Sequence, residues 1–498
     1  MTLGDLLRDA RSVRVPGLAN AGGVADRRVA AVAYDSRDVV AGSVFVALKG
    51  EKVDGARFAL DAVKRGAGAI VSESAAPDDM PAGCIWLTVS SARVALAELA
   101  AIFYGRPSEQ LTLVGVTGTN GKTTTTYLLA AIFEAAGIGC GRIGTVNTKI
   151  GNEERDAART TPEAPDLQRL LREMVDRGLG ACAMEVSSHA LALNRVGELR
   201  FAAGIFSNLT RDHLDFHGDM EQYYVAKRKL FEMLPDSAPS IVNVDDPRGV
   251  ELAASVRRPV TYAIDRPADV SPSQLRYSLD GLHFDIKTPR GTLHVKSPLV
   301  GRPNAYNILA AAAAAAALDL PFDAIERGLA GLAAVPGRFE VVSGAGDDVR
   351  VVVDYAHTDD ALKNLLETAR PLAGGRLITV FGCGGDRDTT KRPLMGAVAA
   401  RLSDLVVVTS DNPRSENPAR IIEEIRRGMT RELGDVLEIV DRREAIERAI
   451  KEARPGDLVL IAGKGHEKYQ IIGDRTIPFD DISVAGDALA RRRSRPRV

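Results

Sequence analysis

A row of glycines and hydroxyl side chains around one lysine is the first group of residues in this chain that could do chemistry. It reads TGTNGKTTTT, residues 117–126, and it follows the apolar run LTLVGV. Glycines let backbone N–H groups close on phosphate oxygens, and the first turn of a following helix adds partial positive charge. Lys122 would reach the β- and γ-phosphates, and the Thr123 hydroxyl would contact Mg²⁺. These residues predict a nucleoside triphosphate site, although Val116 stands where the general pattern has its first glycine.

Candidate metal ligands follow the phosphate loop at two places. Glu185 closes the apolar run that ends in MEVSSHAL. Residues 206–231 contribute three further candidates, which are His213, His217 and Lys227. Each residue alone is more often structural than a ligand, but carboxylate and imidazole groups gathered after a phosphate loop favour a divalent ion, and oxygen ligands suit Mg²⁺. A nucleotide with its metal ion still leaves motors, switches, kinases and ligases open.

The loop TSDNPRSENP, 409–418, presents both signs of charge after another apolar run, LVVV. Asp411, Asn412 and Arg414 stand in it around Pro413, which restricts the backbone. A small molecule that carries both an ammonium and a carboxylate would satisfy these side chains. The alternative is a strand-to-loop turn with only a structural role.

Short β-branched runs that alternate with Ala- and Leu-rich stretches must position these groups. This alternation is typical of α/β layers with largely parallel strands. At 498 residues the chain is too long for one ordinary core, and YGRPSEQ (104–110) and AAVPGRFE (333–340) mark two breaks. We therefore expect a small N-terminal α/β domain, 1–105, a central P-loop ATPase domain with a mostly parallel sheet, 106–336, and a C-terminal Rossmann-like α/β domain, 337–498.

Composition argues against several classes of protein. The net charge of -2 gives no global reason to expect nucleic acid or an anionic membrane as partner, and no run of about 18 apolar residues predicts a membrane span. The first residues lack the charged-then-apolar order of a signal peptide. The cysteines lack CxxC spacing and suit reduced, buried thiols in the cytoplasm; they are Cys84, Cys140, Cys182 and Cys383. We expect a packed helix for the alanines 310–317 and a solvated tail for the Arg-rich residues 491–498.

Motifs along nearly the whole chain resemble those of the Mur ligases of peptidoglycan synthesis. They begin with TGTNGKTTT, TTPE, MEVSSHAL, LTRDHLDFHG, YYVAKRKLF and GRPNAYN. They continue with PGRFE, DYAHT, FGCGGDRDTTKRPLMG, DNPR and AGKGHE. Several ordered motifs in three domains are far more specific than one phosphate loop. The resemblance implies that ATP phosphorylates a substrate carboxylate and that an amine then attacks the acyl phosphate, so that an amide, ADP and phosphate form.

The resemblance also implies roles for the candidate metal ligands. A first Mg²⁺ would be held by the phosphates, Thr123 and Glu185. A second would be held by Glu185, His213 and a carbamylated Lys227. The carbamate makes physical sense, because an ammonium repels a metal ion whereas N6-carboxylysine supplies an anionic oxygen. Together with Lys122, which counters phosphate charge, these last three are the expected catalytic residues.

For ATP, the resemblance implies contacts from the phosphate loop, the adenine side, the interdomain hinge and the ribose-side motif. These residues are Gly118, Thr119, Asn120, Gly121, Lys122, Thr123, Thr124, Asn304, Arg338, Asp354 and His357. Asp359 stands where the family's DYAHTPD has proline, which leaves the stiffness of that turn in question. For the substrate UDP-N-acetylmuramoyl-L-alanyl-D-glutamate, the matching residues are Ser36, Arg37, Thr160, Thr161, Ser187 and Arg195.

The charged loop is assigned by the resemblance to an incoming amino acid, meso-2,6-diaminopimelate. Asp411 and Asn412 would bind its distal ammonium, and Arg414 would form a two-pronged pair with its distal carboxylate. The remaining matching residues are Arg387, Gly463 and Glu467. Lysine lacks the distal carboxylate and would leave Arg414 unpaired, which can mean about 10⁴-fold discrimination.

Other functions remain open at this stage. A lysine-adding Mur ligase is the nearest alternative, and a folylpolyglutamate synthetase-like ligase is the next. A P-loop motor or switch would hydrolyse ATP without an amine, and a non-catalytic scaffold would leave the phosphate-loop residues without a purpose. We expect a monomeric cytoplasmic enzyme that uses neither nucleic acid nor membrane insertion.

Overall fold

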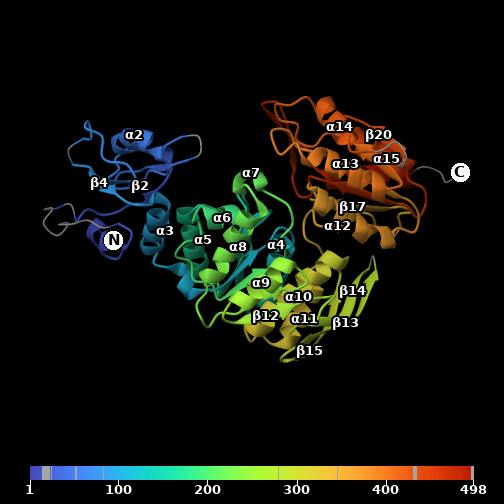
Figure 1. Ribbon diagram of the computed structural model, residues 1–498, viewed down its shortest axis with the longest axis horizontal. Helices are drawn as coiled ribbons and strands as arrows, with labels where there is room; N and C mark the ends of the chain where they lie inside the picture. Colours follow the sequence, from blue (N-terminus) through green and yellow to red (C-terminus); the bar gives the residue numbers. More distant parts are fainter. Residues whose placement is uncertain are drawn as a thin grey trace.

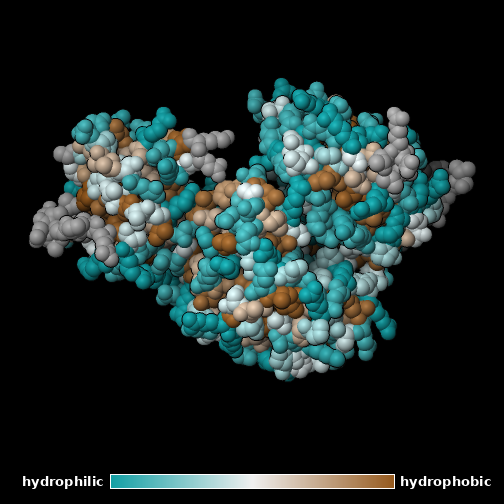
Figure 2. Space-filling view, in the orientation of Figure 1, coloured by the Kyte–Doolittle hydropathy of each residue, from teal (hydrophilic) through white to brown (hydrophobic). Residues whose placement is uncertain are grey.

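Three α/β bodies follow one another along the chain in the computed structural model (Figure 1). It describes residues 1–13, 23, 25–50, 53–81, 83–278, 280–344, 346–429 and 435–494. The first and last bodies stand on either side of the middle one, and helix α7 (Leu214–His217) lies at the foot of the space between them. Figure 2 shows this face of the molecule hollowed at the same place.

The first body has a four-stranded parallel sheet in the order β1-β2-β3-β4. Its strands are β1 (Val32–Ala33), β2 (Val44–Val46), β3 (Ala69–Ser72) and β4 (Ile85–Thr88). Its helices are α1 (Leu3–Arg8), α2 (Ala59–Lys64) and α3 (Ala92–Phe103), with the short 3₁₀ turns η2 (Ser36–Asp38), η3 (Gly55–Phe58) and η4 (Pro107–Gln110). The strands β2 and β3 are buried along their whole length, as parallel strands covered on both faces should be.

The middle body is built on an eight-stranded sheet in the order β12-β11-β10-β5-β9-β6-β7-β8. Its strands are β5 (Thr112–Thr117), β6 (Cys140–Ile143), β7 (Asn147–Ile150), β8 (Glu153–Asp156), β9 (Ala181–Glu185), β10 (Ala203–Phe206), β11 (Ser240–Asn243) and β12 (Pro259–Tyr262). Its helices, besides α7, are α4 (Lys122–Ala135), α5 (Ala164–Asp176), α6 (Ser188–Ala192), α8 (Met220–Glu232) and α9 (Pro247–Ser255). Strand β5 lies at the centre between two parallel neighbours, so the phosphate loop opens where the carboxyl ends of three strands meet.

Helix α10 (Arg302–Ala317) contains the eight alanines and confirms the predicted packed helix. The side chains of residues 310–316 are at most 4% exposed, because α10 packs in the core together with α4 and α11 (Phe322–Gly331). An antiparallel sheet of β13 (Ser271–Ser278), β14 (Gly281–Thr288) and β15 (Gly291–Ser297) covers the same core and was not anticipated. Strands β14 and β15 bury alternate residues on one face, a pattern of antiparallel sheets that the search for parallel strands passed over.

The last body has a six-stranded sheet in the order β16-β17-β21-β18-β19-β20, parallel except for β16 at one edge. Its strands are β16 (Glu340–Val341), β17 (Arg350–Asp354), β18 (Leu377–Phe381), β19 (Leu405–Val408), β20 (Asp435–Glu438) and β21 (Leu458–Ala462), followed by the hairpin β22 (Tyr469–Ile472) and β23 (Arg475–Pro478). Its helices are α12 (Asp359–Ala369), α13 (Lys391–Leu402), α14 (Pro418–Arg426), α15 (Arg442–Glu452) and α16 (Asp481–Arg493), with the turn η5 (Arg370–Leu372). The predicted three-domain α/β fold with mostly parallel sheets is confirmed.

The first Arg-rich residues are at least partly exposed, as predicted for a solvated tail, but they are helical, so the prediction of a tail is wrong there. Arg491–Arg493 form the last turn of α16, where Arg492 pairs with Asp348 at 2.8 Å and Arg491 pairs with Glu447 at 2.7 Å. Basic side chains at a helix C-terminus are favourable, and the acidic partners hold them there. Residues 495–498 lie outside the described residues. No helix in the described ranges is long and apolar enough to cross a membrane.

A buried ion pair ties α15 to α16 beneath the carboxyl ends of two strands of the last sheet. The Arg442 and Asp481 side chains are both fully buried, and their closest atoms, Nη2 and Oδ2, are 2.7 Å apart. The same guanidinium donates to the carbonyl oxygens of Ser410, after β19, and Ala462, at the end of β21. One side chain therefore braces the starts of the DNPR and AGKGHE loops.

We predict that Arg442→Ala lowers the free energy of unfolding by about 3–5 kcal/mol, because it leaves the Asp481 carboxylate buried without its partner. Chemical denaturation of the purified variant measures this loss. Arg443→Ala is the matched control, since Arg443 is the exposed neighbour on the same helix and its removal should change stability little. A loss no larger than that of the control would contradict the bracing role.

Candidate active site

The phosphate loop is shaped by two glycines that no other residue could replace without strain. Gly118 (φ +148°) and Gly121 (φ +89°) adopt backbone angles that favour glycine. A Cβ on Gly118 would lie 1.8 Å from the Ser207 hydroxyl, and one on Gly121 would lie 2.4 Å from Asn307 Oδ1. Between them, the Asn120 N–H donates to Asn208 Oδ1 at 2.9 Å. The loop after β5 is thus held in one conformation by residues distant in sequence.

Lys122 and Thr123, predicted to meet the phosphates and the metal ion, both lie in this loop. The Lys122 ammonium donates to the carbonyl oxygens of Gly118 and Thr119, each at 2.8 Å. Burial lowers the pKa of Lys122, opposed by the charges of Glu185 and Asp212. The predicted residues Thr123 and Thr124 are each 4% exposed at the start of α4. Among the described residues the ammonium has only peptide oxygens as acceptors, so a phosphate oxygen would be a stronger partner.

Glu185 ends β9 with a carboxylate that is only 1% exposed. Its Oε1 accepts from the Thr145 N–H at 2.8 Å, and its Oε2 accepts from the Thr145 hydroxyl at 3.0 Å. The Thr145 hydroxyl also lies 3.0 Å from that of Thr160, while Thr161 donates to the Glu185 carbonyl at 2.8 Å. Gly144 makes this approach possible, since a Cβ there would lie 2.3 Å from Glu185 Oε1. Sequence reasoning missed Gly144 and Thr145, although GTVNT follows directly after the strand CGRI.

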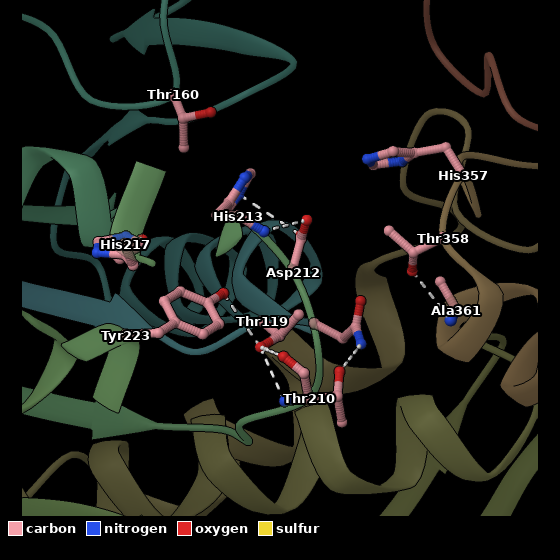
Figure 3. A network of polar contacts seen from close by, with 12 residues as sticks. Thr119, Thr160, Thr210, Asp212, His213, His217, Tyr223, His357, Thr358 and Ala361 are labelled. Carbon is pink, nitrogen blue, oxygen red and sulfur yellow. Dashed lines mark hydrogen bonds and ion pairs between the residues drawn. The ribbon is translucent and has the colours of Figure 1, made fainter. Parts of the chain in front are cut away.

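A histidine cluster lies beside the phosphate loop and includes the predicted residues His213 and His217 (Figure 3). The His189 ring lies 4.7 Å from the His213 ring and 5.5 Å from the His217 ring, measured between centroids. His217 Nε2 is 2.9 Å from the Ser188 hydroxyl. Burial is the main cause that lowers the pKa values of His213 and His217 to about 4. Both imidazoles are therefore neutral at pH 7, the form that binds metal ions.

Lys227 is the most unusual side chain of the site. It projects from α8, is 1% exposed, and has its Nζ 4.3 Å from the centroid of the Tyr223 ring. Within the described ranges its ammonium has no hydrogen bond or ion pair. Burial, reinforced by the positive charge of Lys122, lowers its pKa well below the usual value. Lys229, two residues on in the same helix, is exposed, so the two lysines lie in opposite environments.

Asp212 is a site residue that sequence reasoning did not single out. Figure 3 shows its carboxylate between His213 and His357, which belong to different bodies. Its Oδ1 accepts from the His213 N–H at 2.8 Å, and its Oδ2 is 3.5 Å from His213 Nε2. Burial alone would raise the pKa of Asp212, but the charge of Lys122, together with those of His213 and His357 in their protonated forms, lowers it. The motif RDHLD contained it, but nothing local distinguished it from the acids nearby.

Of the predicted nucleotide residues in the last body, Arg338 contacts the start of α4 directly, whereas Asp354 and His357 lie on the strand end and loop that follow it in the chain. Arg338 Nη2 donates to the Thr123 hydroxyl at 3.3 Å, and its guanidinium lies 4.7 Å from the Tyr355 ring centroid. Its buried Nε has no acceptor among the described residues, which leaves one donor for a ligand. Asp354 accepts from the Phe339 N–H at 2.7 Å, and burial raises its pKa.

The turn that lacks the family's proline is capped by a hydroxyl instead. Thr358 accepts from the Ala361 N–H at 3.2 Å, and Asp359 occupies the first turn of α12, where a negative charge is favourable. Asp360 Oδ2 accepts from Asn120 Nδ2 at 3.4 Å, across the two bodies. Asn304, predicted to lie on the adenine side, is buried at the start of α10 and donates to the Val300 carbonyl at 2.8 Å.

The residues predicted for the UDP-linked substrate fall into two groups. Ser36 and Arg37 lie in η2 of the first body, where Arg37 Nε donates to Asp35 at 2.9 Å. Thr160, Thr161, Ser187 and Arg195 lie in the middle body around the Glu185 strand. A buried acid that sequence reasoning missed, Glu163, lies among the second group. Its carboxylate pairs with three guanidinium groups, those of Arg93, Arg159 and Arg195.

The loop DNPR lies at the carboxyl end of β19, beside the hairpin β22–β23. Arg414 has φ +51°, an uncommon value for arginine, and is fixed because its N–H donates to Ile471 O at 3.1 Å and its carbonyl accepts from Gly473 at 2.7 Å. Its Nη1 donates to the Gly385 carbonyl at 2.7 Å, in the loop that also carries the exposed Arg387. The guanidinium is therefore held in place by backbone rather than by an acid.

The remaining residues predicted to bind the amino acid share one network of contacts. Asn412 Nδ2 donates to Glu467 Oε2 at 2.9 Å, and Asn412 Oδ1 accepts from the Ile471 N–H at 3.0 Å. Asp411 lies against Gly463, where a Cβ would be 2.7 Å from its Oδ2. Asn412 is thus engaged on both sides by the protein itself, while Asp411 and Glu467 present the acidic oxygens.

Among the described residues, no group of three or more His, Cys, Asp and Glu side chains is placed to hold a metal ion. Oxygen donors from Thr123 and Glu185 are nevertheless buried side by side with the loop that would hold phosphates. Mg²⁺ is commonly bound by one or two protein groups together with phosphates and water. The residues present fit that kind of site, and they do not fit a cage made by the protein alone.

Comparison with known proteins decides the family. The Mur ligase middle domain matches residues 116–315, the glutamate ligase domain of Mur ligases matches 337–465, and the catalytic domain of the Mur ligase family matches 28–104. A relative from Solibacter usitatus (strain Ellin6076), named UDP-N-acetylmuramoyl-L-alanyl-D-glutamate--2,6-diaminopimelate ligase, is 49% identical over 495 residues, 98% of each chain. The chain belongs to the Mur ligase family.

Two further proteins lie close to this Mur ligase. A relative of the same name from Gloeobacter violaceus (strain ATCC 29082 / PCC 7421) is 48% identical over 471 residues, 94% of this chain and 96% of its own. A solved structure of a UDP-N-acetylmuramoyl-L-alanyl-D-glutamate--2,6-diaminopimelate ligase has a TM-score of 0.69 at 31% identity and covers 99% of this chain and 100% of its own. The three-body arrangement is therefore that of a whole Mur ligase.

We predict that Gly144→Ala reduces ligase turnover roughly 100-fold while the protein still folds, because the added methyl displaces the Glu185 carboxylate from the site. Steady-state kinetics and thermal melting of the purified variant measure both properties. Gly331→Ala is the matched control, since a Cβ there meets nothing within 4 Å. Equal activities of the two variants would show that the position of Glu185 is unimportant.

Proposed function

We propose that this Mur ligase joins meso-2,6-diaminopimelate to UDP-N-acetylmuramoyl-L-alanyl-D-glutamate at the expense of ATP, through an acyl phosphate, with release of ADP and phosphate. The observation that carries the proposal is the Arg414 guanidinium, held at the edge of the site beside the acids Asp411 and Glu467. Full-length relatives that carry this name support it. The enzyme acts as a cytoplasmic monomer, without nucleic acid.

Lys122 and the backbone N–H groups of the phosphate loop bind the phosphates of ATP. Phosphoryl transfer to a carboxylate needs charge neutralisation and alignment more than covalent help from the protein. Lys122 supplies one positive charge for this purpose. Arg338, whose Nε lacks an acceptor among the described residues, supplies a second. Because Arg338 and His357 belong to the last body, the nucleotide site is complete only when that body contacts the phosphate loop.

Mg²⁺ fits the oxygen donors of this site, and Thr123 and Glu185 would hold it. When bound, it would neutralise charge on the transferring phosphoryl group. Glu185 is prepared for this role because Thr145 fixes both of its oxygens. His213, neutral at pH 7, and Lys227 as N6-carboxylysine would complete a second ion site.

Carbamylation of Lys227 would remove the unfavourable burial of an unpaired positive charge. A buried ammonium without an anionic partner is costly, and its lowered pKa favours the neutral amine, which is the form that reacts with CO₂. The product is an anion, so it relieves the repulsion from Lys122 instead of adding to it. Tyr223 packs against the Lys227 side chain and restricts where the new group points.

The acceptor substrate is held by the first and middle bodies. Ser36 and Arg37 bind its uridine end, while Thr160, Thr161, Ser187 and Arg195 hold the muramoyl-peptide portion. Thr160 and Thr161 share hydrogen bonds with the Glu185 strand and with Thr145, so the reacting carboxylate is guided towards the phosphate loop. The buried Glu163 orients the Arg195 side chain.

The amine donor is held by the last body. Arg414 pairs with the distal carboxylate of diaminopimelate, with Arg387 and Gly463 beside it. Asp411 and Glu467 accept from the distal ammonium, whereas Asn412 acts through Glu467 because its own amide is engaged by the protein. L-lysine would leave Arg414 without an anion, which disfavours the lysine-adding alternative.

A panel of amino acids tests this assignment directly. With ATP, Mg²⁺ and the UDP-linked dipeptide, we expect kcat/KM for meso-diaminopimelate to exceed that for L-lysine by about 10⁴. Arg414→Ala should lower kcat/KM for diaminopimelate roughly 10²- to 10⁴-fold and abolish most of that preference. Arg420→Ala, on the exposed face of α14, is the control. Similar rates with both amino acids in the unsubstituted enzyme would overturn the substrate assignment.

Intact-protein mass measurement under native conditions tests the carbamate. We expect an increment of one CO₂, lost on acidification because the protonated carbamate releases CO₂, and restored by bicarbonate at neutral pH. Lys227→Ala should lose at least about 10³-fold in turnover, as expected for removal of a catalytic charge, whereas Lys229→Ala should retain activity. A fully active Lys227→Ala, or an unmodified Lys227 in the active enzyme, would contradict the role.

A further inference from the structure

Lys464 is a buried lysine in the last body to which the proposed reaction gives no part. It follows β21 in the turn AGKGHE, and none of its side-chain surface is exposed. The Glu467 N–H donates to the Lys464 carbonyl at 3.0 Å, so the two residues share one tight turn. A fully buried ammonium requires partners that are themselves fixed.

The Lys464 ammonium joins the two loops of the amino-acid site. Its Nζ donates to Glu467 Oε2 at 2.9 Å and to Asn412 Oδ1 at 3.1 Å. Asn412 belongs to DNPR, whereas Glu467 belongs to AGKGHE, 55 residues further along the chain. The Tyr469 ring, whose centroid is 5.4 Å from Nζ, closes another side.

The positions of the donors settle which way the Asn412 amide faces. Two donors, the Lys464 ammonium and the Ile471 N–H, point at one atom of that amide, so this atom is the oxygen. The amide nitrogen therefore faces Glu467 and donates to Oε2 at 2.9 Å. Without the ammonium of Lys464, one of the two constraints on this orientation is lost.

The two carboxylate oxygens of Glu467 differ in their hydrogen bonds. Oε2 accepts from both Lys464 and Asn412, whereas Oε1 accepts no hydrogen bond from the described residues. The side chain is 18% exposed, so Oε1 is open to a small molecule. A carboxylate fixed by one oxygen presents the other in a defined direction.

We propose that Lys464 is a positioning residue that sets the direction of Glu467 Oε1 towards the distal ammonium of the incoming amino acid. This inference rests on the proposed function. Lys464 does not touch the substrate, because Asn412 and Glu467 surround its ammonium. It contributes to the recognition of diaminopimelate through Glu467 and takes no part in phosphoryl transfer.

Two amino acids that differ only in the distal ammonium separate positioning from a general structural role. L-2-aminopimelate keeps the reacting amine and the distal carboxylate of diaminopimelate but lacks the second amine. If Lys464 acts through Glu467, Lys464→Met should raise KM for diaminopimelate at least about tenfold and leave KM for aminopimelate nearly unchanged. KM for ATP and for the UDP-linked substrate should also stay the same.

The experiment compares Lys464→Met, Glu467→Gln and the double variant as full-length enzymes, with Lys468→Met as the exposed-lysine control. We expect the double variant to match Glu467→Gln in its preference between the two amino acids, since each substitution disrupts the same contact. Lys464→Gln, which can still donate one hydrogen bond, replaces the methionine variant if that variant does not fold.

Each outcome decides the inference. Equal losses with both amino acids, or effects of Lys464 and Glu467 that add independently, would overturn the positioning role while leaving the proposed function intact. An unsubstituted enzyme that turns over neither amino acid would overturn the proposed function together with this inference. A rise in KM that occurs with diaminopimelate but not with aminopimelate, and that Lys468→Met does not show, supports the inference.

Discussion

The site is organised around positive charge that forms no salt bridge, since among the described residues none of Lys122, Lys227 and Arg338 pairs with an acid. Within the described part of the chain Lys122 donates only to peptide oxygens, and burial together with the charge of Lys122 lowers the pKa of Lys227. Arg338 brings a third cation with an unused donor from the last body, as far as the described residues show. Such an arrangement is costly in the absence of a ligand and becomes favourable when triphosphate and a lysine carbamate provide the negative charge. The triphosphate and the carbamate would therefore neutralise positive charge that the described residues alone leave unpaired.

The loops predicted to bind the amino acid follow a different rule, because the buried arginines that brace them are paired with acids of the protein itself. Buried Arg442 braces the starts of both loops, and buried Arg392 joins the Gly384 carbonyl to the acids Glu416 and Glu424. The hinge packs on the second loop, since a Cβ on Gly337 would lie 2.2 Å from the His466 nitrogen. Arg338, which contacts Thr123 at the start of α4, thus directly follows Gly337, which packs against the AGKGHE loop. Contact between the last and middle bodies therefore positions the phosphate loop and the predicted amino-acid site relative to each other.

Much of this could be predicted from the sequence because its chemistry is local. A strand, a glycine loop and a helix follow one another around Lys122, and LVVV followed by DNPR needs only a strand and a stiff turn. The fold class followed from the same alternation, whereas the domain boundaries and the site assignments stay predictions. Thr145, Glu163 and Lys464 were missed because each acts through partners distant in the chain, which no local pattern records. The antiparallel strands β13–β15 and the helical Arg491–Arg493 were missed for a related reason, since partners on other elements stabilise them.

The central claim is that ATP activates a carboxylate of the UDP-linked substrate by transferring a phosphoryl group to it. That carboxylate can be labelled with heavy oxygen and the phosphate released during turnover with diaminopimelate analysed by mass spectrometry. Formation and aminolysis of an acyl phosphate predict that one labelled oxygen appears in each inorganic phosphate. Phosphate that carries no label, while amide product forms, would contradict the account.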